Sequence, residues 1–364
     1  MRNRKIDIII PAYKGHNTIW QTLSSIASQT IIDDIETTIA NDCCTGGDYQ
    51  EFVNMFSPYM KIREVKTDKN GGPGVARQKG IDSTNNEYIA FIDDDDIFYC
   101  ATAIETLRNA IEEPVSIDKG SYLGSNYACV TSPFLEETRD GIIKHPCGYT
   151  AHTHGKLYKR EFLEKYNVHF SKSRTGEDVG FNTWVRMLCS MPENSVNDID
   201  SLTYLWKYNE ISISRANNFE SKYVYGFCND VDNGIWAFEN AKKSKVPDDI
   251  IKKFIIDRMI ALYRMYIVWF LKEAPMFATQ AWEYIKKFYH AVYEPVKNSI
   301  LDQEFFNEFA IDSMKRKLHN SFVCSVFNMS IQEFMRKLES EEYNPDDIKR
   351  IWADIPEELK QTSV

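Results

Sequence analysis

The stretch Tyr88-Ile89-Ala90-Phe91-Ile92-Asp93-Asp94-Asp95-Asp96 decides the fold. Its first half is a short apolar run, which predicts a strand buried on both faces, as in a parallel sheet. Its second half places four adjacent carboxylates where that strand ends, and ligands of open α/β sheets bind beyond such ends. Adjacent anions repel one another, and Mg²⁺ and Mn²⁺ prefer carboxylate oxygens. The stretch therefore indicates a metal–phosphate site, with a solvated acidic loop as the alternative.

The residues before this stretch alternate between strand and helix patterns. Apolar runs predict the strands, and apolar residues at helical spacing predict the helices between them. Such alternation is typical of β-α-β units, and so of a mostly parallel sheet flanked by helices in an α/β domain. Strands are predicted at residues 6–10, 36–40, 62–66 and 88–92, and helices at 19–27, 49–56 and 75–81.

The pattern changes beyond residue 111. A hairpin is predicted from 129–135 and 142–144, followed by helices at 159–166 and 179–188 and a strand at 202–208. From about residue 223 strand patterns give way to helices at 254–271, 280–292, 305–318 and 331–338, with another beginning at Asn344. The sequence therefore predicts an α/β domain over residues 1–222 and an all-helical C-terminal region over residues 223–364.

Composition excludes some classes of protein. The 364 residues carry a formal net charge of −10, which argues against broad binding to nucleic acid. The 8 cysteines form no CxxC pair, so free thiols in a reducing cytosol are expected. Asp7 and Pro11 interrupt the first apolar run, which predicts a strand and not a signal peptide. Asp257, Arg258 and Arg264 make the most apolar stretch too charged for a membrane span.

Polar residues also follow the first two predicted strands. Pro11 and Tyr13 follow the first strand, and Asp42 follows the second. In a parallel sheet these residues lie at the same edge as the acidic stretch. There, Asp42 can accept hydrogen bonds from a nucleobase and Tyr13 can stack on it, although a tyrosine by itself is more often a packing residue.

A glycine turn, Asn70-Gly71-Gly72-Pro73-Gly74, opens the predicted helix that contains Arg77. Such a turn lets backbone N–H groups approach an anion, which the helix dipole also favours. The turn lacks the GK[ST] ending of a P-loop and does not match GxGxxG, so a purely structural turn is the alternative.

Two further groups of titratable residues occur later in the chain. Glu177 and Asp178 begin a predicted helix, where acids are usually caps but one can serve as a general base. His152 and His154 form an HxH pattern, which in a strand places both rings on one face and permits metal binding. An ordinary surface or core role remains open for each histidine.

Taken together and in order, the motifs PAY, ND, NGGPGVAR, FIDDDD, HGKLYKREFL and GED resemble those of family 2 glycosyltransferases, which are inverting enzymes with the GT-A fold. The resemblance spans about Lys5–Ser214. It implies a Rossmann-like catalytic domain whose nucleotide-sugar half covers residues 1–100 and whose acceptor half covers residues 101–222. It also implies a mobile segment between Tyr204 and Ser214.

The resemblance assigns roles to single residues. It makes Asp178 the catalytic base and Asp95 the ligand of a Mn²⁺ or Mg²⁺ ion. The nucleotide is expected to contact Pro11, Tyr13, Asp42, Asn70, Gly72, Arg77 and Asp93. Further donor or acceptor contacts are expected from Asp94, Asp96, His154, Glu177 and Lys207. The chain departs from the family where Asn41, Cys43 and Cys44 replace a second acidic segment.

The resemblance implies metal-dependent inverting transfer of a sugar from a UDP-sugar to a hydroxyl acceptor, a glycan or a cell-envelope polysaccharide. Two alternatives remain open at this point. A nucleotidyltransferase acting on sugar phosphates normally has a glycine-rich basic loop after its first strand, and Ala12-Tyr13-Lys14-Gly15-His16 is a poor version of one. A non-catalytic carbohydrate-binding scaffold could retain the same fold.

The helical tail is rich in both aromatic and basic residues. We expect it to be a packed subdomain that shapes the acceptor site or a dimer interface, because its apolar residues surround the helices instead of forming one stripe. The alternative is a peripheral membrane contact of a cytoplasmic enzyme.

Overall fold

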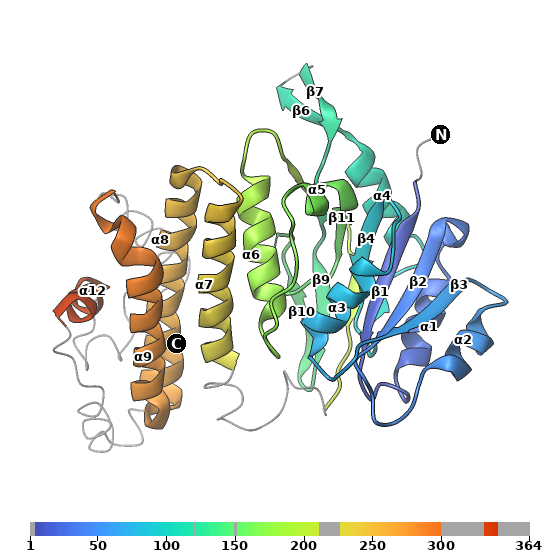
Figure 1. The fold of residues 1–364 in the computed structure, drawn as a ribbon, viewed down its shortest axis with the longest axis horizontal. Coiled ribbons are helices and arrows are strands. Elements are labelled where there is room, and N and C mark those ends of the chain that lie inside the picture. The colour runs from blue at the N-terminus through green and yellow to red at the C-terminus, as the bar shows by residue number, and fades with distance from the viewer. Residues whose placement is uncertain (1–3, 119–120, 149–150, 211–225, 300–330, 341–364) are drawn as a thin grey trace. The chain divides into compact units, whose positions relative to one another are not determined.

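The computed structural model of the protein describes residues 4–118, 121–148, 151–210, 226–299 and 331–340 (Figure 1). The chain divides into two compact units, Met1–Ser212 and Ile213–Val364. Each unit is described by itself below.

The first part of unit 1 confirms the predicted alternation of strands and helices. Parallel strands β1, β2 and β3 pair in sequence order, and β4 pairs with the other side of β1, so the order is β4-β1-β2-β3. The elements are β1 (Ile6–Ala12), α1 (Ile19–Ala27), β2 (Ile35–Asn41), α2 (Gln50–Phe56), β3 (Lys61–Lys66), α3 (Pro73–Asp82) and β4 (Tyr88–Phe91).

Strand β1 is buried along its whole length because helices cover both faces of the sheet. Its side chains alternate between the faces: Ile8 and Ile10 join the core that includes Leu23 of α1, whereas Ile9 faces α3. A methyl group at Gly80 of α3 would lie 2.3 Å from Ile9, so a glycine there allows the helix to approach the sheet. Strand β1 therefore lies at the centre of the unit.

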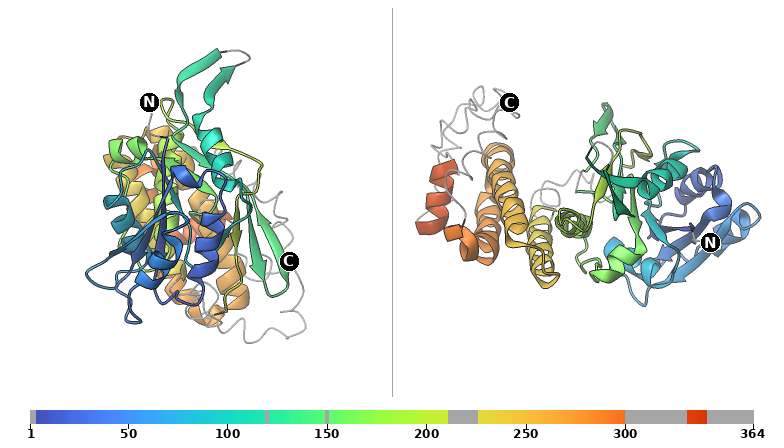
Figure 2. Two further views of the ribbon diagram at one scale, coloured as in Figure 1. Left: turned by 90° about the vertical axis from the view of Figure 1, so that its right-hand side faces the viewer. Right: turned by 90° about the horizontal axis from the view of Figure 1, so that it is seen from above.

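The rest of unit 1 extends this sheet and adds a smaller one. The large sheet has 7 strands in the order β12-β8-β11-β4-β1-β2-β3, with β11 antiparallel to β4 and β8. The second sheet has the order β10-β9-β13-β5, and the β6–β7 hairpin projects from the unit (Figure 1, Figure 2). The strands are β5 (Ile97–Phe98), β6 (Pro114–Asp118), β7 (Ser121–Asn126), β8 (Cys129–Thr131), β9 (Phe134–Thr138), β10 (Gly141–His145), β11 (Lys156–Lys159), β12 (Val196–Asp198) and β13 (Tyr204–Trp206), and the helices are α4 (Ala103–Glu112), α5 (Arg160–Lys165) and α6 (Glu177–Cys189).

One prediction about this region was wrong in detail. The apolar run 129–135 is not one arm of a hairpin: β8 belongs to the large sheet, β9 belongs to the small sheet, and Pro133 lies between them. Proline has no N–H for a ladder, which favours a break at this position. The hairpin is instead formed by β9 and β10. His152 and His154 lie in the loop before β11 and not in a strand.

Every described element of unit 2 is helical, as predicted. The predicted helices 254–271, 280–292 and 331–338 are found, with π-helical turns ending the first two. The predictions at 305–318 and at Asn344 lie outside the described residues. The elements are α7 (Phe227–Lys243), α8 (Asp248–Met265), a π-helix (Tyr266–Glu273), a 3₁₀ turn (Pro275–Phe277), α9 (Ala278–Phe288), a π-helix (Tyr289–Tyr293), a 3₁₀ turn (Glu294–Ser299) and α12 (Ile331–Ser340).

Large aromatic residues form the interior of unit 2. Tyr266, Trp282 and Phe334 contact one another with ring centroids 5.2–6.2 Å apart, and all three are at most 1% exposed. These aromatic rings therefore pack within the helical unit. In the described ranges, no helix combines the length and the apolar character that crossing a bilayer requires.

Candidate active site

Four polar segments of unit 1 meet at the carboxyl edge of its parallel strands. Tyr13 follows β1, Asp42 follows β2, the glycine turn precedes α3, and Asp93 to Asp96 follow β4. Pro11 lies two positions before Tyr13, buried inside β1 beside Ala40. Tyr13 is 42% exposed, so its ring is accessible to a ligand. The fold therefore brings the predicted nucleotide-binding segments to one edge.

The four consecutive acids face different partners, because successive residues of a turn point in different directions. Asp94 Oδ2 accepts the backbone N–H of Tyr13 at 3.2 Å, which ties the acidic turn to the end of β1. A methyl group at Gly15 would lie 2.0 Å from the same oxygen, so a larger residue there would displace the Asp94 carboxylate. Burial and the charges of Asp95 and Asp93 raise the pKa of Asp94 well above its usual range.

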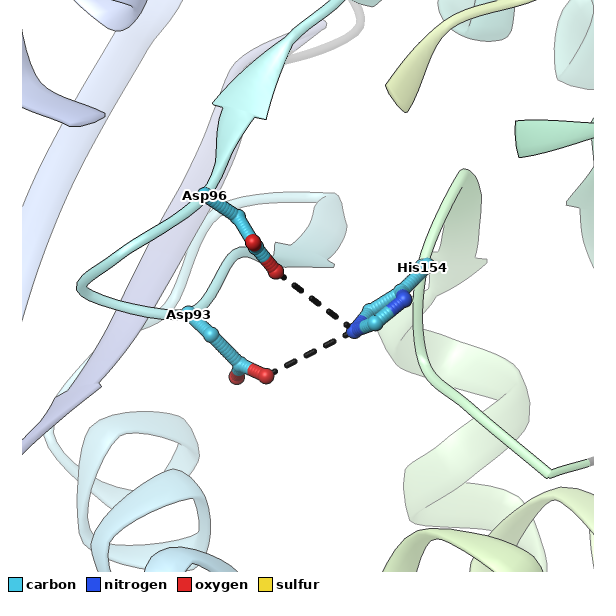
Figure 3. Close-up of side chains that lie close together, drawn as sticks. All are labelled: Asp93, Asp96 and His154. Carbon is cyan, nitrogen blue, oxygen red and sulfur yellow. Dashed lines mark hydrogen bonds and ion pairs between the residues drawn. The ribbon is translucent and has the colours of Figure 1, made fainter. Parts of the chain in front are cut away.

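Asp93, Asp96 and His154 form a group that could hold a metal ion (Figure 3). His154 Nε2 lies 3.5 Å from Asp93 Oδ2 and 3.7 Å from Asp96 Oδ2, and the ligand atoms lie within 4.8 Å of one another. Burial lowers the pKa of His154 to about 4, so the ring is neutral, the form in which imidazole binds metals. Two carboxylates and one imidazole suit Mn²⁺, so these residues fit the expected metal.

Asp96 is fully buried and strongly hydrogen bonded. Its Oδ2 accepts the Tyr204 hydroxyl at 2.6 Å, and its Oδ1 accepts the backbone N–H of Lys207 at 2.8 Å. Burial and the charges of Asp93 and Asp95 raise the pKa of Asp96 well above its usual range. Lys207 thus contacts the cluster through its backbone. A bound divalent cation would favour the ionised form of Asp96.

Asp95, the predicted metal ligand, lies outside that group of three. Its Oδ2 accepts the side-chain amide of Asn209 at 2.8 Å. Asn209 was not predicted as a site residue, although it lies in the segment Tyr204–Ser214 that the family resemblance singles out. The role of Asp95 as a metal ligand stays a prediction.

Arg77 is buried between two acids, one 16 and one 100 residues away in the sequence. Its Nη2 donates to Asp93 Oδ1 and its Nη1 donates to Glu177 Oε1, both at 2.6 Å. Burial alone would raise the pKa of Asp93, but Arg77 and His154 hold it well below its usual range. Burial and the charge of Asp178 raise the pKa of Glu177 to about 7, against the opposing effect of Arg77. Arg77 therefore joins the acidic turn to the start of α6.

The carboxylate of Asp42 organises the glycine turn. Its Oδ1 accepts the N–H of Gly71 at 2.9 Å and the hydroxyl of Thr67 at 3.1 Å, and its Oδ2 accepts the N–H of Gly72 at 2.7 Å. A carboxylate offers about four acceptor positions, so these bonds leave roughly one for a nucleobase. Asn70 is held separately, because its Oδ1 accepts Nη1 of Arg174 at 2.8 Å.

Asp178, the predicted base, lies in the first turn of α6 next to His152. His152 Nδ1 is 3.5 Å from Asp178 Oδ2, and the side chains are 23% and 17% exposed. Burial would raise the pKa of Asp178, but His152 and Arg77 lower it below its usual value. The carboxylate is therefore ionised and reachable from solvent, as a general base requires. His152 was not among the predicted site residues, although the HxH spacing marks it.

The two histidines also make close contacts with aromatic rings. His154 stacks on Tyr204 with centroids 4.3 Å apart, and Trp206 lies 4.8 Å from the ring of His152. The two histidine rings also stack on each other, 4.8 Å apart with an angle of 11° between their planes. The two rings therefore lie side by side although they belong to a loop and not to a strand.

Known proteins resemble this chain in sequence. Residues 7–170 match the model of glycosyl transferase family 2. A poly(ribitol-phosphate) beta-glucosyltransferase of Bacillus spizizenii is 24% identical over 82% of this chain and 46% of its own length. An uncharacterized glycosyltransferase of Rickettsia felis is 34% identical over 63% of this chain and 37% of its own length. The chain spans less than half the length of these two relatives.

Solved structures share the fold. TarS 1–349 of S. aureus in complex with UDP-GlcNAc aligns with a TM-score of 0.55 and 15% identity, covering 86% of this chain and 92% of that one. The mannosyltransferase PcManGT of Pyrobaculum calidifontis, in complex with GDP-Man and Mn²⁺, aligns with a TM-score of 0.50 and 12% identity, covering 96% and 88%. The predicted GT-A-type fold is confirmed. The family match runs from β1 to the loop before α6, and over these residues the chain is similar to glycosyl transferase family 2.

Proposed function

We propose that the chain transfers a sugar from a nucleotide sugar to a hydroxyl acceptor, with inversion at the anomeric carbon and with Mn²⁺ or Mg²⁺. The observation that carries this proposal is the convergence of the acidic turn and Asp178, which Arg77 and the two stacked histidines bring together. The nucleotide-sugar half is residues 1–100, the acceptor half is residues 101–222, and residues 223–364 form the helical region.

In this mechanism Asp178 removes the proton from the acceptor hydroxyl as the oxygen attacks the anomeric carbon. The bond to the diphosphate breaks in the same step, which inverts the configuration. Asp93 and Asp95 would hold the metal, and Asp96 and His154 offer further ligand atoms nearby. When bound, the metal offsets the charge that develops on the leaving diphosphate. Arg77 keeps Asp93 ionised and fixes the start of α6.

We propose a uridine nucleotide as the donor. Tyr13 is exposed for stacking, and Asp42 retains about one acceptor position for a base N–H. The UDP-GlcNAc complex of TarS supports this choice, whereas the GDP-Man complex of PcManGT shows that the fold also accepts guanosine. A glycan or cell-envelope polysaccharide is the proposed acceptor, since similar proteins are named as poly(ribitol-phosphate) transferases.

The proposal includes a cytoplasmic location. All cysteines in the described ranges are free, which fits a reducing compartment. The helical region is proposed to shape the acceptor site or a dimer interface. Peripheral membrane contact is the alternative, and flotation of the full chain with anionic vesicles would separate the two.

The test is a panel of nucleotide sugars, each with and without Mn²⁺, scored for release of the nucleoside diphosphate. We expect release from UDP-sugars only when the metal is present. A nucleotidyltransferase would instead make pyrophosphate from UTP and a sugar phosphate. A carbohydrate-binding scaffold would release nothing under any condition.

A further inference from the structure

A buried side-chain amide connects the loop that carries His152 to the helix that carries Asp178. Asn182 of α6 is 3% exposed, and its Nδ2 donates to the backbone carbonyl of His152 at 3.0 Å and to that of Asp178 at 2.8 Å. Its Oδ1 accepts the Tyr158 hydroxyl at 2.7 Å. The bonding capacity of this amide is thus used to hold the loop, the helix and β11 together.

A second buried donor reaches the same carbonyl. Lys156 Nζ donates to the backbone oxygen of His152, although the lysine is only 6% exposed. Burying an ammonium group costs free energy unless the group is well paired. Moving the loop away would leave the Lys156 ammonium without this partner, so the contact stabilises the position of the loop. The backbone of His152 is therefore held from below by two side chains.

The ring of His152 is confined from its sides. It stacks on His154, lies 4.8 Å from Trp206, and meets Phe134 edge-on at 5.8 Å. These contacts restrict rotation of the ring and direct Nδ1 at Asp178 Oδ2. The distance of 3.5 Å is long for a hydrogen bond, but such contacts often shorten once a substrate binds.

The two oxygens of Asp178 then have separate partners. Oδ1 lies 2.9 Å from the backbone N–H of Val179, and Oδ2 faces His152. His154, two residues later, faces Asp93 and Asp96 instead. The first histidine of the HxH pair therefore faces Asp178, and the second faces the acidic turn.

We propose that His152 is a positioning residue for the transfer reaction: its Nδ1–H donates to Asp178 Oδ2 and fixes the orientation of that carboxylate toward the acceptor. This proposal rests on the proposed function, in which Asp178 is the base. His152 acts through Asp178 and does not itself take the acceptor proton.

Two variants of similar polarity test this role. In His152→Asn the amide group occupies the place of Nδ1, whereas in His152→Gln it occupies the place of Nε2. We expect His152→Asn to retain kcat within roughly three-fold, and His152→Gln and His152→Ala to lower kcat by ~10–100-fold, with the donor KM nearly unchanged. His169→Gln is the matched control, because His169 bonds the carbonyl of Asn167 instead.

Equal losses in His152→Asn and His152→Gln, or losses that appear only in KM, would overturn the proposal. A second measurement needs no substrate: ¹⁵N NMR of histidine-labelled protein, with the His152 signal assigned by its absence in His152→Asn. We expect a proton on Nδ1 that Asp178→Ala disturbs, and a neutral ring protonated only on Nε2 would overturn the proposal. A chain that shows the expected tautomer but turns over no nucleotide sugar supports the contact and removes the proposed function instead.

Discussion

Gly74 of α3 lies directly against the side chain of Glu177 of α6. A methyl group at Gly74 would be 2.6 Å from Glu177 Cγ and 2.9 Å from the backbone oxygen of Ser171. The two helices are about 100 residues apart in the sequence, and this close approach lets Arg77 reach Glu177. The glycine-rich segment therefore does more than form a turn, because Gly74 also allows α3 and α6 to approach each other closely.

The first prediction concerns this approach. Gly74→Ala should lower the free energy of unfolding by ~1–3 kcal/mol, because backbone and a buried side chain must move to admit the methyl group. Thermal unfolding by calorimetry measures the effect. Gly234→Ala is the matched control: its nearest neighbour would be an ordinary 3.5 Å away, so helix propensity should make it neutral or stabilising. Equal behaviour of the two variants would contradict the steric argument.

The second prediction concerns Glu177 and pH. Its pKa rises from 4.5 to about 7 in the folded chain, so between these values the folded state holds a proton that the unfolded state has released. The contribution of Glu177 to stability is therefore complete below pH 4.5 and is lost as the pH rises through 7. The difference between the urea unfolding profiles of wild type and Glu177→Gln should change across this window by on the order of 1–3 kcal/mol. Parallel profiles would show that Glu177 is ionised throughout.

The third prediction concerns the base. Asp178→Asn should abolish transfer and leave donor affinity within a few fold, because proton removal matters only in the transition state. Transfer rates and donor titration calorimetry on the same preparation separate the two effects. Near wild-type transfer would exclude Asp178 and make Glu177 the next candidate.

The fourth prediction concerns the metal. Excess EDTA should stop transfer, and Mn²⁺ or Mg²⁺ should restore it. Asp95→Asn should lose metal-supported UDP binding, because an amide cannot supply the missing charge. The control is Asp48→Asn, because Asp48 is an exposed acid whose Oδ1 accepts the backbone N–H of Gln50. Full activity in EDTA would refute metal dependence, and unchanged binding by Asp95→Asn would leave Asp93, Asp96 and His154 as the ligands.

The fifth prediction concerns Asp42. Asp42→Ala should weaken UDP binding by ~1–3 kcal/mol, since the N–H groups of Gly71 and Gly72 lose their acceptor and the turn loses its shape. Thr67→Val removes a neighbouring hydroxyl but keeps the carboxylate, and it should bind UDP nearly as wild type does. Equal affinity of wild type for UDP, GDP and CDP would argue that Asp42 serves the turn alone.

The sequence by itself determined the β-α-β order, the burial of the central strands and the edge at which the site lies. These features follow from local patterns: continuous apolar runs need cover on both faces, and polar residues after such runs must emerge at one end of a parallel sheet. The order of the motifs was sufficient to indicate the family before any contact was known. The split of residues 129–135 between two sheets was missed, because an apolar run does not show which sheet it joins.

Only the tertiary structure decided which acid meets which partner. The four aspartates look equivalent in sequence, yet Asp94 bonds Tyr13, Asp95 bonds Asn209 and Asp96 bonds Tyr204, 108 residues later in the chain. The contact of Arg77 with a nucleotide stays a prediction, whereas its bridge between Asp93 and Glu177 was not foreseen. Pairs of this kind depend on how the strands are ordered and how closely α3 and α6 approach, and no local periodicity encodes that distance. The sequence therefore indicated the edge of the sheet where the candidate residues lie, and the packing of α3 against α6 determined which of them form hydrogen bonds with one another.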